Sequence, residues 1–173
     1  MREESVHKVI NGLKEMPRDD FIDIHKKSMS KLKNKKIDSN KFITIFTDAS
    51  YDYSIKAAGW AGWIKHGHPA ETIRLSGKLF DIQNINIAEK YAIELSIKEL
   101  IERNITVKDK IIVIQSDSEY ALSKVDISGL KDALRVNLKH VKGHQGKKCV
   151  RSAVNTWCDK EARRILREIR KKI

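Results

Sequence analysis

Apolar and polar positions beyond residue 41 repeat with the two periods of a mixed α/β domain. Continuous or alternating apolar runs predict strands, and apolar positions three or four residues apart predict helices. The predicted strands are 42–47, 57–65, 71–78, 110–115 and 134–141. The predicted helices are 86–103, 118–125 and 152–172. This order predicts a mixed five-stranded sheet, with three antiparallel strands followed by parallel strands that crossover helices connect and flank.

Residues 1–40 have a different pattern. Helical spacing up to the Met16-Pro17 pair is kept by four apolar residues, Val6, Val9, Ile10 and Leu13. A second apolar stretch follows Asp19-Asp20, and residues 31–40 are polar and rich in lysine. We therefore expect a small helical N-terminal extension and linker over 1–40, which could bind a protein or nucleic acid, and a separate domain over 41–173.

Composition limits the classes of protein that the chain can belong to. The apolar run Ile111-Ile112-Val113-Ile114 is far too short to span a bilayer, and residues 1–20 lack the apolar stretch of a secretory signal. Cys149 and Cys158 make neither a disulfide framework nor a zinc pattern. We expect a cytoplasmic protein without a membrane partner.

The net charge of +12 is unevenly distributed. Residues 1–41 have a net charge of +4, residues 42–118 of −1 and residues 119–173 of +9. Basic surface binds polyphosphates by releasing their counterions. The charge therefore favours a nucleic-acid partner, although a basic protein without such a partner would have the same composition.

Four carboxylates and one histidine stand where predicted elements begin or end. They are Asp48, Glu89, Asp117, Asp159 and His144. Active groups of open α/β sheets gather at the carboxyl ends of central strands, so we expect the four acids to converge. Two such charges about 4 Å apart repel by about 4 kcal/mol at an effective dielectric near 20. Divalent cations with oxygen ligands relieve that repulsion, and paired metals commonly cleave phosphodiesters.

The short motifs around these residues resemble those of the type 1 ribonuclease H family. The resemblance covers about residues 42–170. It rests on five motifs in order: Thr47-Asp48-Ala49-Ser50, Glu89 with Ala92, Ser116-Asp117-Ser118-Glu119-Tyr120, Val141-Lys142-Gly143-His144-Gln145-Gly146, and Asn155 with Cys158-Asp159-Lys160-Glu161-Ala162-Arg163. Each motif alone is weak, but five in the same order on the expected elements are a specific signal.

The resemblance implies a monomeric endoribonuclease that cuts the RNA strand of RNA–DNA hybrids and leaves 5′-phosphate and 3′-hydroxyl ends. It implies two Mg²⁺ ions, which Mn²⁺ can replace. Asp48 would bridge both metals, Asp159 would complete the site of the attacking water, and Glu89 with Asp117 would complete the site of the leaving oxygen. His144 would assist proton movement or product release. Residues that the resemblance places on the substrate are Ser50, Asn86 and Lys142.

The chain departs from the family pattern at three places. Ala49 stands where many members have glycine, and Glu119 where bacterial members commonly have glutamine. The segment between Asp117 and His144 is too short for the basic helix of larger bacterial enzymes, so its role falls to residues 139–151 or to the last helix, whose exposed face carries Arg163, Arg164 and Arg167. Two alternatives stay open: a related DNA-cleaving nuclease of the resolvase or transposase kind, and a non-catalytic nucleic-acid-binding module.

Overall fold

A five-stranded sheet organises the described part of the chain, which in this computed structural model comprises residues 39–141 and 150–173. The strands are β1 (Phe42–Asp52), β2 (Ala57–His66), β3 (Glu71–Leu79), β4 (Ile111–Ser116) and β5 (Arg135–His140). They lie in the order β3-β2-β1-β4-β5. β1, β2 and β3 pair antiparallel, whereas β4 runs parallel to both β1 and β5. This mixed sheet confirms the predicted fold class.

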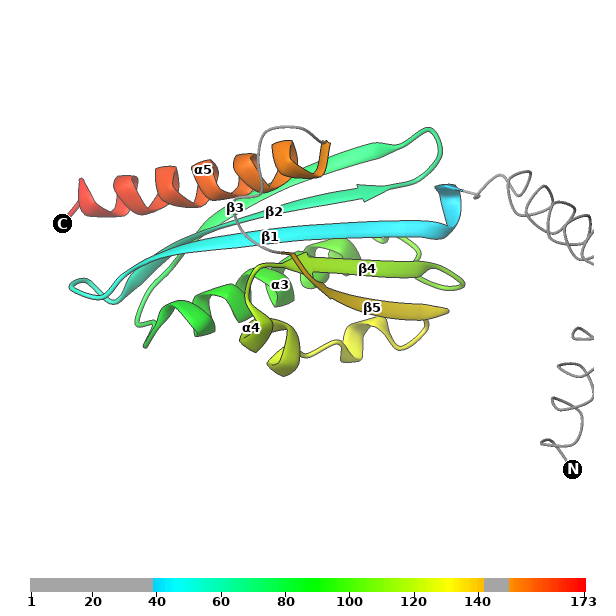
Figure 1. Ribbon diagram of the computed structural model, residues 1–173, viewed down its shortest axis with the longest axis horizontal. Helices are drawn as coiled ribbons and strands as arrows, with labels where there is room; N and C mark the ends of the chain where they lie inside the picture. The colour runs from blue at the N-terminus through cyan, green and yellow to red at the C-terminus, as the bar shows by residue number, and fades with distance from the viewer. Residues whose placement is uncertain (1–38, 142–149) are drawn as a thin grey trace, which may run out of the picture. The chain divides into compact units, whose positions relative to one another are not determined.

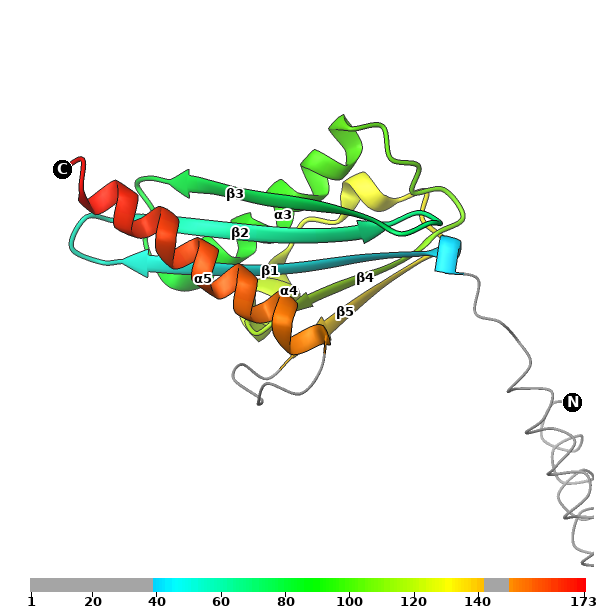
Figure 2. The same ribbon diagram turned by 90° about the horizontal axis from the view of Figure 1, so that it is seen from above.

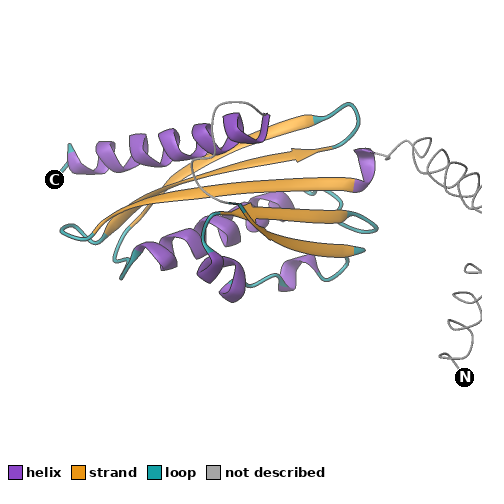
Figure 3. Ribbon diagram, viewed as in Figure 1, coloured by secondary structure: helices purple, strands orange, loops and turns teal. Residues whose placement is uncertain are grey.

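Helices cover both faces of the sheet (Figure 1). They are α3 (Ile85–Glu102), α4 (Glu119–Lys124) and α5 (Val150–Arg170), with 3-10 turns at Ser39–Lys41 and Ser128–Leu130. α3 and α4 lie on one face and α5 on the other, as the colouring by secondary structure also shows (Figure 3). Among the described residues, no helix is both long and apolar enough to cross a membrane.

Each face of the sheet has its own apolar core. The β-branched residues of β1 and β4, such as Ile45 and Ile114, pack with α3 residues such as Ile93. On the opposite face, Phe46 packs against Cys158 and Ala162 of α5. The buried and exposed residues of α5 alternate as its sequence predicts, which fixes the helix on the sheet by a single apolar face.

Two glycines let the helices approach β2 closely. A Cβ atom on Gly59 would lie 2.2 Å from the carbonyl oxygen of Ala162 in α5, and one on Gly62 would lie 2.4 Å from Ser96 Oγ in α3. Real Cβ atoms essentially never lie this close to another atom, so a side chain at either position would force its neighbours to shift. Figure 2 shows the resulting path of α5 across β1 and β2.

The observed boundaries agree with the predicted ones within two residues, except at the end of β1. The prediction that β1 ends at Thr47, directly before Asp48, is wrong. β2 supplies antiparallel partners as far as the pair Asp52–Ala57, so β1 continues through Asp48. The parallel pairing with β4 ends earlier, at Phe46–Gln115. Asp48 thus lies inside a strand on one side and just beyond the parallel ladder on the other.

Candidate metal centre

Three carboxylates meet where β1 and β4 separate. Asp48 follows the last parallel pair on β1, and Asp117 follows the end of β4. Glu89 reaches the same point from α3. One oxygen from each of Asp48, Glu89 and Asp117 lies within 4.8 Å of the other two. Carboxylate oxygens at this spacing suit a hard divalent cation such as Mg²⁺.

The position of Glu89 follows from the start of α3. Asn84 is the N-cap, and its Oδ1 accepts a hydrogen bond from the Ile87 N–H at 3.1 Å. That start places Glu89 in the second helical turn, one turn later than predicted, on the face that contacts β1. Its carboxylate is buried, with only 4% of the residue exposed. A buried charge requires a partner, which helix packing alone does not provide.

One backbone amide orients two of the carboxylates. The Ala49 N–H donates to Asp48 Oδ1 at 2.8 Å and to Glu89 Oε1 at 3.0 Å. The other oxygen of Glu89, Oε2, is buried and has no hydrogen-bond partner among the described residues. A buried acceptor without a donor is costly. A cation among the three acids would remove that cost.

Burial and mutual repulsion hold protons on this cluster. Loss of water, together with the smaller effect of the Asp48 and Asp117 charges, raises the pKa of Glu89 to about 9. Burial also raises the pKa of Asp48 to about 7, with added repulsion from Asp117 and Asp159. The shared Ala49 N–H lowers the pKa of both groups, but by less. Without a cation the centre therefore keeps protons that ordinary carboxylates release near pH 4.

Asp159 lies near this centre but outside the three-residue group. It occupies the third turn of α5, because the helix begins at Val150. Its charge reaches Asp48, whose pKa it raises. Its Oδ1 also forms an ion pair with Arg163 Nε at 2.8 Å. The structure therefore brings together three of the four predicted acids and places the fourth beside them.

Several solved ribonuclease H structures are similar to this chain over most of its length. One is ribonuclease H1 from the archaeon Halobacterium salinarum, with a TM-score of 0.54 and 14% identity over 73% of this chain and 98% of that one. Another is the N-terminal ribonuclease H domain of Rv2228c from Mycobacterium tuberculosis, with a TM-score of 0.56 and 15% identity over 76% and 97%. A third is LC11 ribonuclease H1, isolated from compost by a metagenomic approach and solved with an RNA/DNA hybrid, with a TM-score of 0.55 and 16% identity over 73% and 98%. The chain has the ribonuclease H fold.

Two comparisons with known sequences find no relative of the chain. No model of a protein family matches the chain, and no curated protein sequence matches it either. At 14–16% identity, the likeness to the solved ribonucleases H1 establishes the fold. Arguments about activity therefore depend on the acids themselves.

The departures from the ribonuclease H pattern have local explanations. Glu119 Oε1 faces His140 Nδ1 at 3.2 Å, and the other ring nitrogen of His140 lies 3.0 Å from the carbonyl oxygen of Asp117. Glu119 is exposed and turned toward this histidine, which offsets its charge when protonated. The contacts of His140 with Glu119 and Asp117 were not predicted from the sequence. Its place at the end of β5, beside the end of β4, could have indicated them. Ala49 contributes its backbone amide, which its methyl group does not obstruct.

The predicted substrate contacts occupy different surroundings. Ser50 is half-buried on β1, two residues beyond Asp48. Asn86 is exposed in the first turn of α3 and is not the cap, because Asn84 has that role. Lys142 and His144 lie outside the described residues, so their predicted roles stay predictions.

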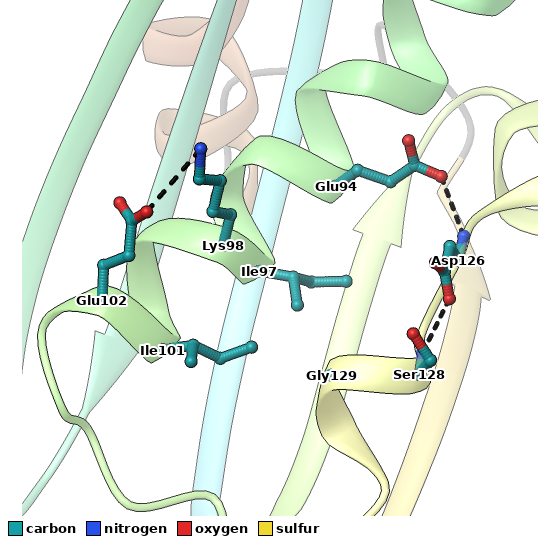
Figure 4. A pocket seen from close by; sticks show the side chains of 8 residues that line it. All are labelled: Glu94, Ile97, Lys98, Ile101, Glu102, Asp126, Ser128 and Gly129. Carbon is teal, nitrogen blue, oxygen red and sulfur yellow. Dashed lines mark hydrogen bonds and ion pairs between the residues drawn. The ribbon is translucent and has the colours of Figure 1, made fainter.

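A pocket of about 380 Å³ lies away from the metal centre, between α3 and residues 126–129 (Figure 4). Its polar groups bind one another: Glu94 Oε1 accepts from the Asp126 N–H at 2.9 Å, and Asp126 Oδ1 accepts from the Ser128 N–H at 2.8 Å. Lys98 pairs with Glu102 at 3.6 Å. These contacts leave no converging free polar group, so the pocket is not a candidate catalytic site.

Proposed function

We propose that the protein is a metal-dependent endoribonuclease that hydrolyses the RNA strand of RNA–DNA hybrids and leaves 5′-phosphate and 3′-hydroxyl ends. The ribonuclease H fold and the acidic triad support a nuclease of this fold. The observation that carries the proposal is the buried, unpartnered Oε2 of Glu89 beside Asp48 and Asp117. Such an arrangement is costly unless a cation binds there, so it favours a working metal site over an unused one.

Two Mg²⁺ ions, or Mn²⁺ in their place, would supply the positive charge that activates a water and stabilises the leaving oxygen. Asp48, Glu89 and Asp117 would hold the metals, with Asp159 completing the set. The Ala49 N–H binds one oxygen of Asp48 and one of Glu89, and so holds both carboxylates in place beside Asp117. His144 would move a proton near the product, and Ser50, Asn86 and Lys142 would contact the hybrid.

Hybrid specificity can be tested with three substrates. An RNA–DNA hybrid, duplex RNA and duplex DNA are incubated with the full chain in Mg²⁺, and the ends of any product are analysed. We expect cleavage of the RNA strand of the hybrid alone, and loss of that cleavage in Asp117→Asn. Cleavage of DNA would instead identify a resolvase-like or transposase-like relative. Binding of all substrates without cleavage would identify a non-catalytic module.

A further inference from the structure

A groove of about 480 Å³ runs along α5 from Asp159, the acid that lies beside the metal centre. The alternation of β1 puts Asp48, Ser50 and Asp52 on the face toward α5. The groove is lined from β1 by Ser50, and from α5 by Asp159, Lys160, Arg163, Arg167 and Arg170. At its far end, Arg170 Nη2 contacts Asp52 Oδ2 at 2.5 Å. The groove therefore begins at Asp159, beside the three acids, and follows the last residues of β1.

The α5 side of this groove is a row of positive charges. Positions 160, 163, 167 and 170 lie on one helical face, and they span about 15 Å along the helix axis. Arg163 is paired with Asp159, and Arg170 with Asp52. Lys160 and Arg167 are exposed and make no ion pair with any described residue. Two cations are thus available to a ligand, and the two paired arginines extend the row.

Arg164, which we expected on the same face, belongs elsewhere. Its guanidinium binds Glu161 Oε1 at 2.7 Å and also contacts Glu168. Glu161 in turn accepts a hydrogen bond from Ser76 Oγ of β3 at 2.9 Å. The basic face predicted from the sequence therefore divides into a groove face and a face that ion pairs already satisfy.

We propose that this groove binds the sugar–phosphate backbone of the strand being cut, over the phosphates next to the scissile one. Asp159 lies beside the acids and lines one end of the groove, so a strand with its scissile phosphate at the acids would bring neighbouring phosphates to the basic row. A row of about 15 Å is long enough to contact more than one of these phosphates. Arginine forks bind phosphate oxygens with two hydrogen bonds and without reading sequence. The inference rests on the proposed nuclease function, because it needs the scissile phosphate at the metal centre.

The test is a charge reversal at the two unpaired positions, Lys160→Glu with Arg167→Glu, in the full chain. The matched control is Lys108→Glu with Lys131→Glu, which changes the net charge by the same amount. Both lysines are exposed and precede β4 and β5, at the end of these strands away from the metal centre. Fluorescence anisotropy in EDTA measures the binding of an RNA–DNA hybrid over a range of salt concentrations. We expect the groove variant to bind more weakly, and its slope of log K against log salt to become less steep by about 2. In the control variant the slope should change by less than 1.

Single-turnover cleavage separates binding from chemistry. We expect KM to rise in the groove variant while the maximal rate stays that of the wild type. The groove assignment would be overturned if the groove variant and the wild type had equal salt slopes. It would also be overturned if the groove variant and the control lost equal amounts of hybrid affinity. A wild-type protein that binds hybrid but cuts none would overturn the proposed function, and the groove inference that depends on it would fall with it. Circular dichroism melts verify that both variants fold.

Discussion

At the residue scale, a single amide accounts for much of the geometry of the metal centre. The Ala49 N–H holds one oxygen of Asp48 and one of Glu89, while Glu89 Oε2 has no hydrogen-bond partner among the described residues. Because one N–H cannot offset two buried charges, the pKa of both carboxyl groups stays raised. In the metal-free protein these two carboxyl groups are therefore either protonated or charged and repelling one another, so the stability of the protein should depend on pH.

We expect the free energy of unfolding of the metal-free protein to fall between pH 5 and pH 8, by on the order of 6 kcal/mol. The folded protein keeps protons up to the raised pKa values, about 7 for Asp48 and about 9 for Glu89, whereas the unfolded chain releases them near its ordinary values of 3.8 and 4.5. Unfolding in this range therefore releases protons, and rising pH favours the unfolded chain. Urea titrations in EDTA at several pH values measure the effect.

The same experiment with Asp48→Asn and with Mg²⁺ identifies the cause. Asp48→Asn removes one repelling charge, so it should be more stable than the wild type at pH 8 and lose less stability with pH. Mg²⁺ should stabilise the wild type, because a ligand of the folded state alone raises its stability, and should stabilise the variant less. A metal-free protein whose stability ignores pH, Mg²⁺ and this substitution would show that the acids do not repel one another.

At the element scale, α5 connects the core to both the metal centre and the basic groove. Its buried face packs on β1 and β2, while Asp159 and Arg163 lie on the side toward β1. The close contact of Gly59 with the backbone of α5 fixes how near the helix lies. A change at Gly59 should therefore affect both stability and the site.

We expect Gly59→Ala to destabilise the protein by about 1–3 kcal/mol, because its methyl group meets backbone atoms that cannot move independently. Hybrid cleavage should also fall, since α5 carries Asp159. Gly129→Ala is the control: its methyl group meets only the flexible end of Ile101, so the cost should be small. Chemical denaturation and cleavage assays measure both effects. A Gly59→Ala protein as stable and active as Gly129→Ala would contradict this role of α5.

The elements were predictable where the local pattern is decisive. The β-branched run Ile111–Ile114 indicates a buried strand, and the apolar face of α5 follows from its helical spacing. The length of β1 was not predictable, because it depends on pairing with β2, a tertiary contact. The pairing of Arg164 with Glu161 and Glu168 could have been read from their spacing of three and four residues. The pairing of Glu119 with His140 joins distant residues, so the local pattern could not reveal it.

At the scale of the whole molecule, the acids and the sheet all lie beyond residue 41. The predicted division at residue 40 stays a prediction. We expect a 41–173 fragment to fold and to cleave hybrid, with slightly weaker binding, because a net charge of +3 is lost with residues 1–40. Circular dichroism melts and cleavage assays of the fragment measure this. An unfolded fragment would show that residues 1–40 belong to the core of the domain.

The proposed function requires the buried acids to form a metal-dependent catalytic centre. The most direct measurement is the single-turnover rate of hybrid cleavage in Mg²⁺ by Glu89→Gln, with Glu102→Gln, an exposed residue of the same helix, as control. Glutamine keeps the shape of Glu89 but cannot supply the charge that holds a metal. Losing a metal ligand should cost Glu89→Gln several kcal/mol of transition-state stabilisation. Its cleavage rate should therefore be at least about a hundredfold lower than that of the wild type, with hybrid binding retained. A Glu89→Gln rate equal to that of the wild type and of Glu102→Gln would contradict the account.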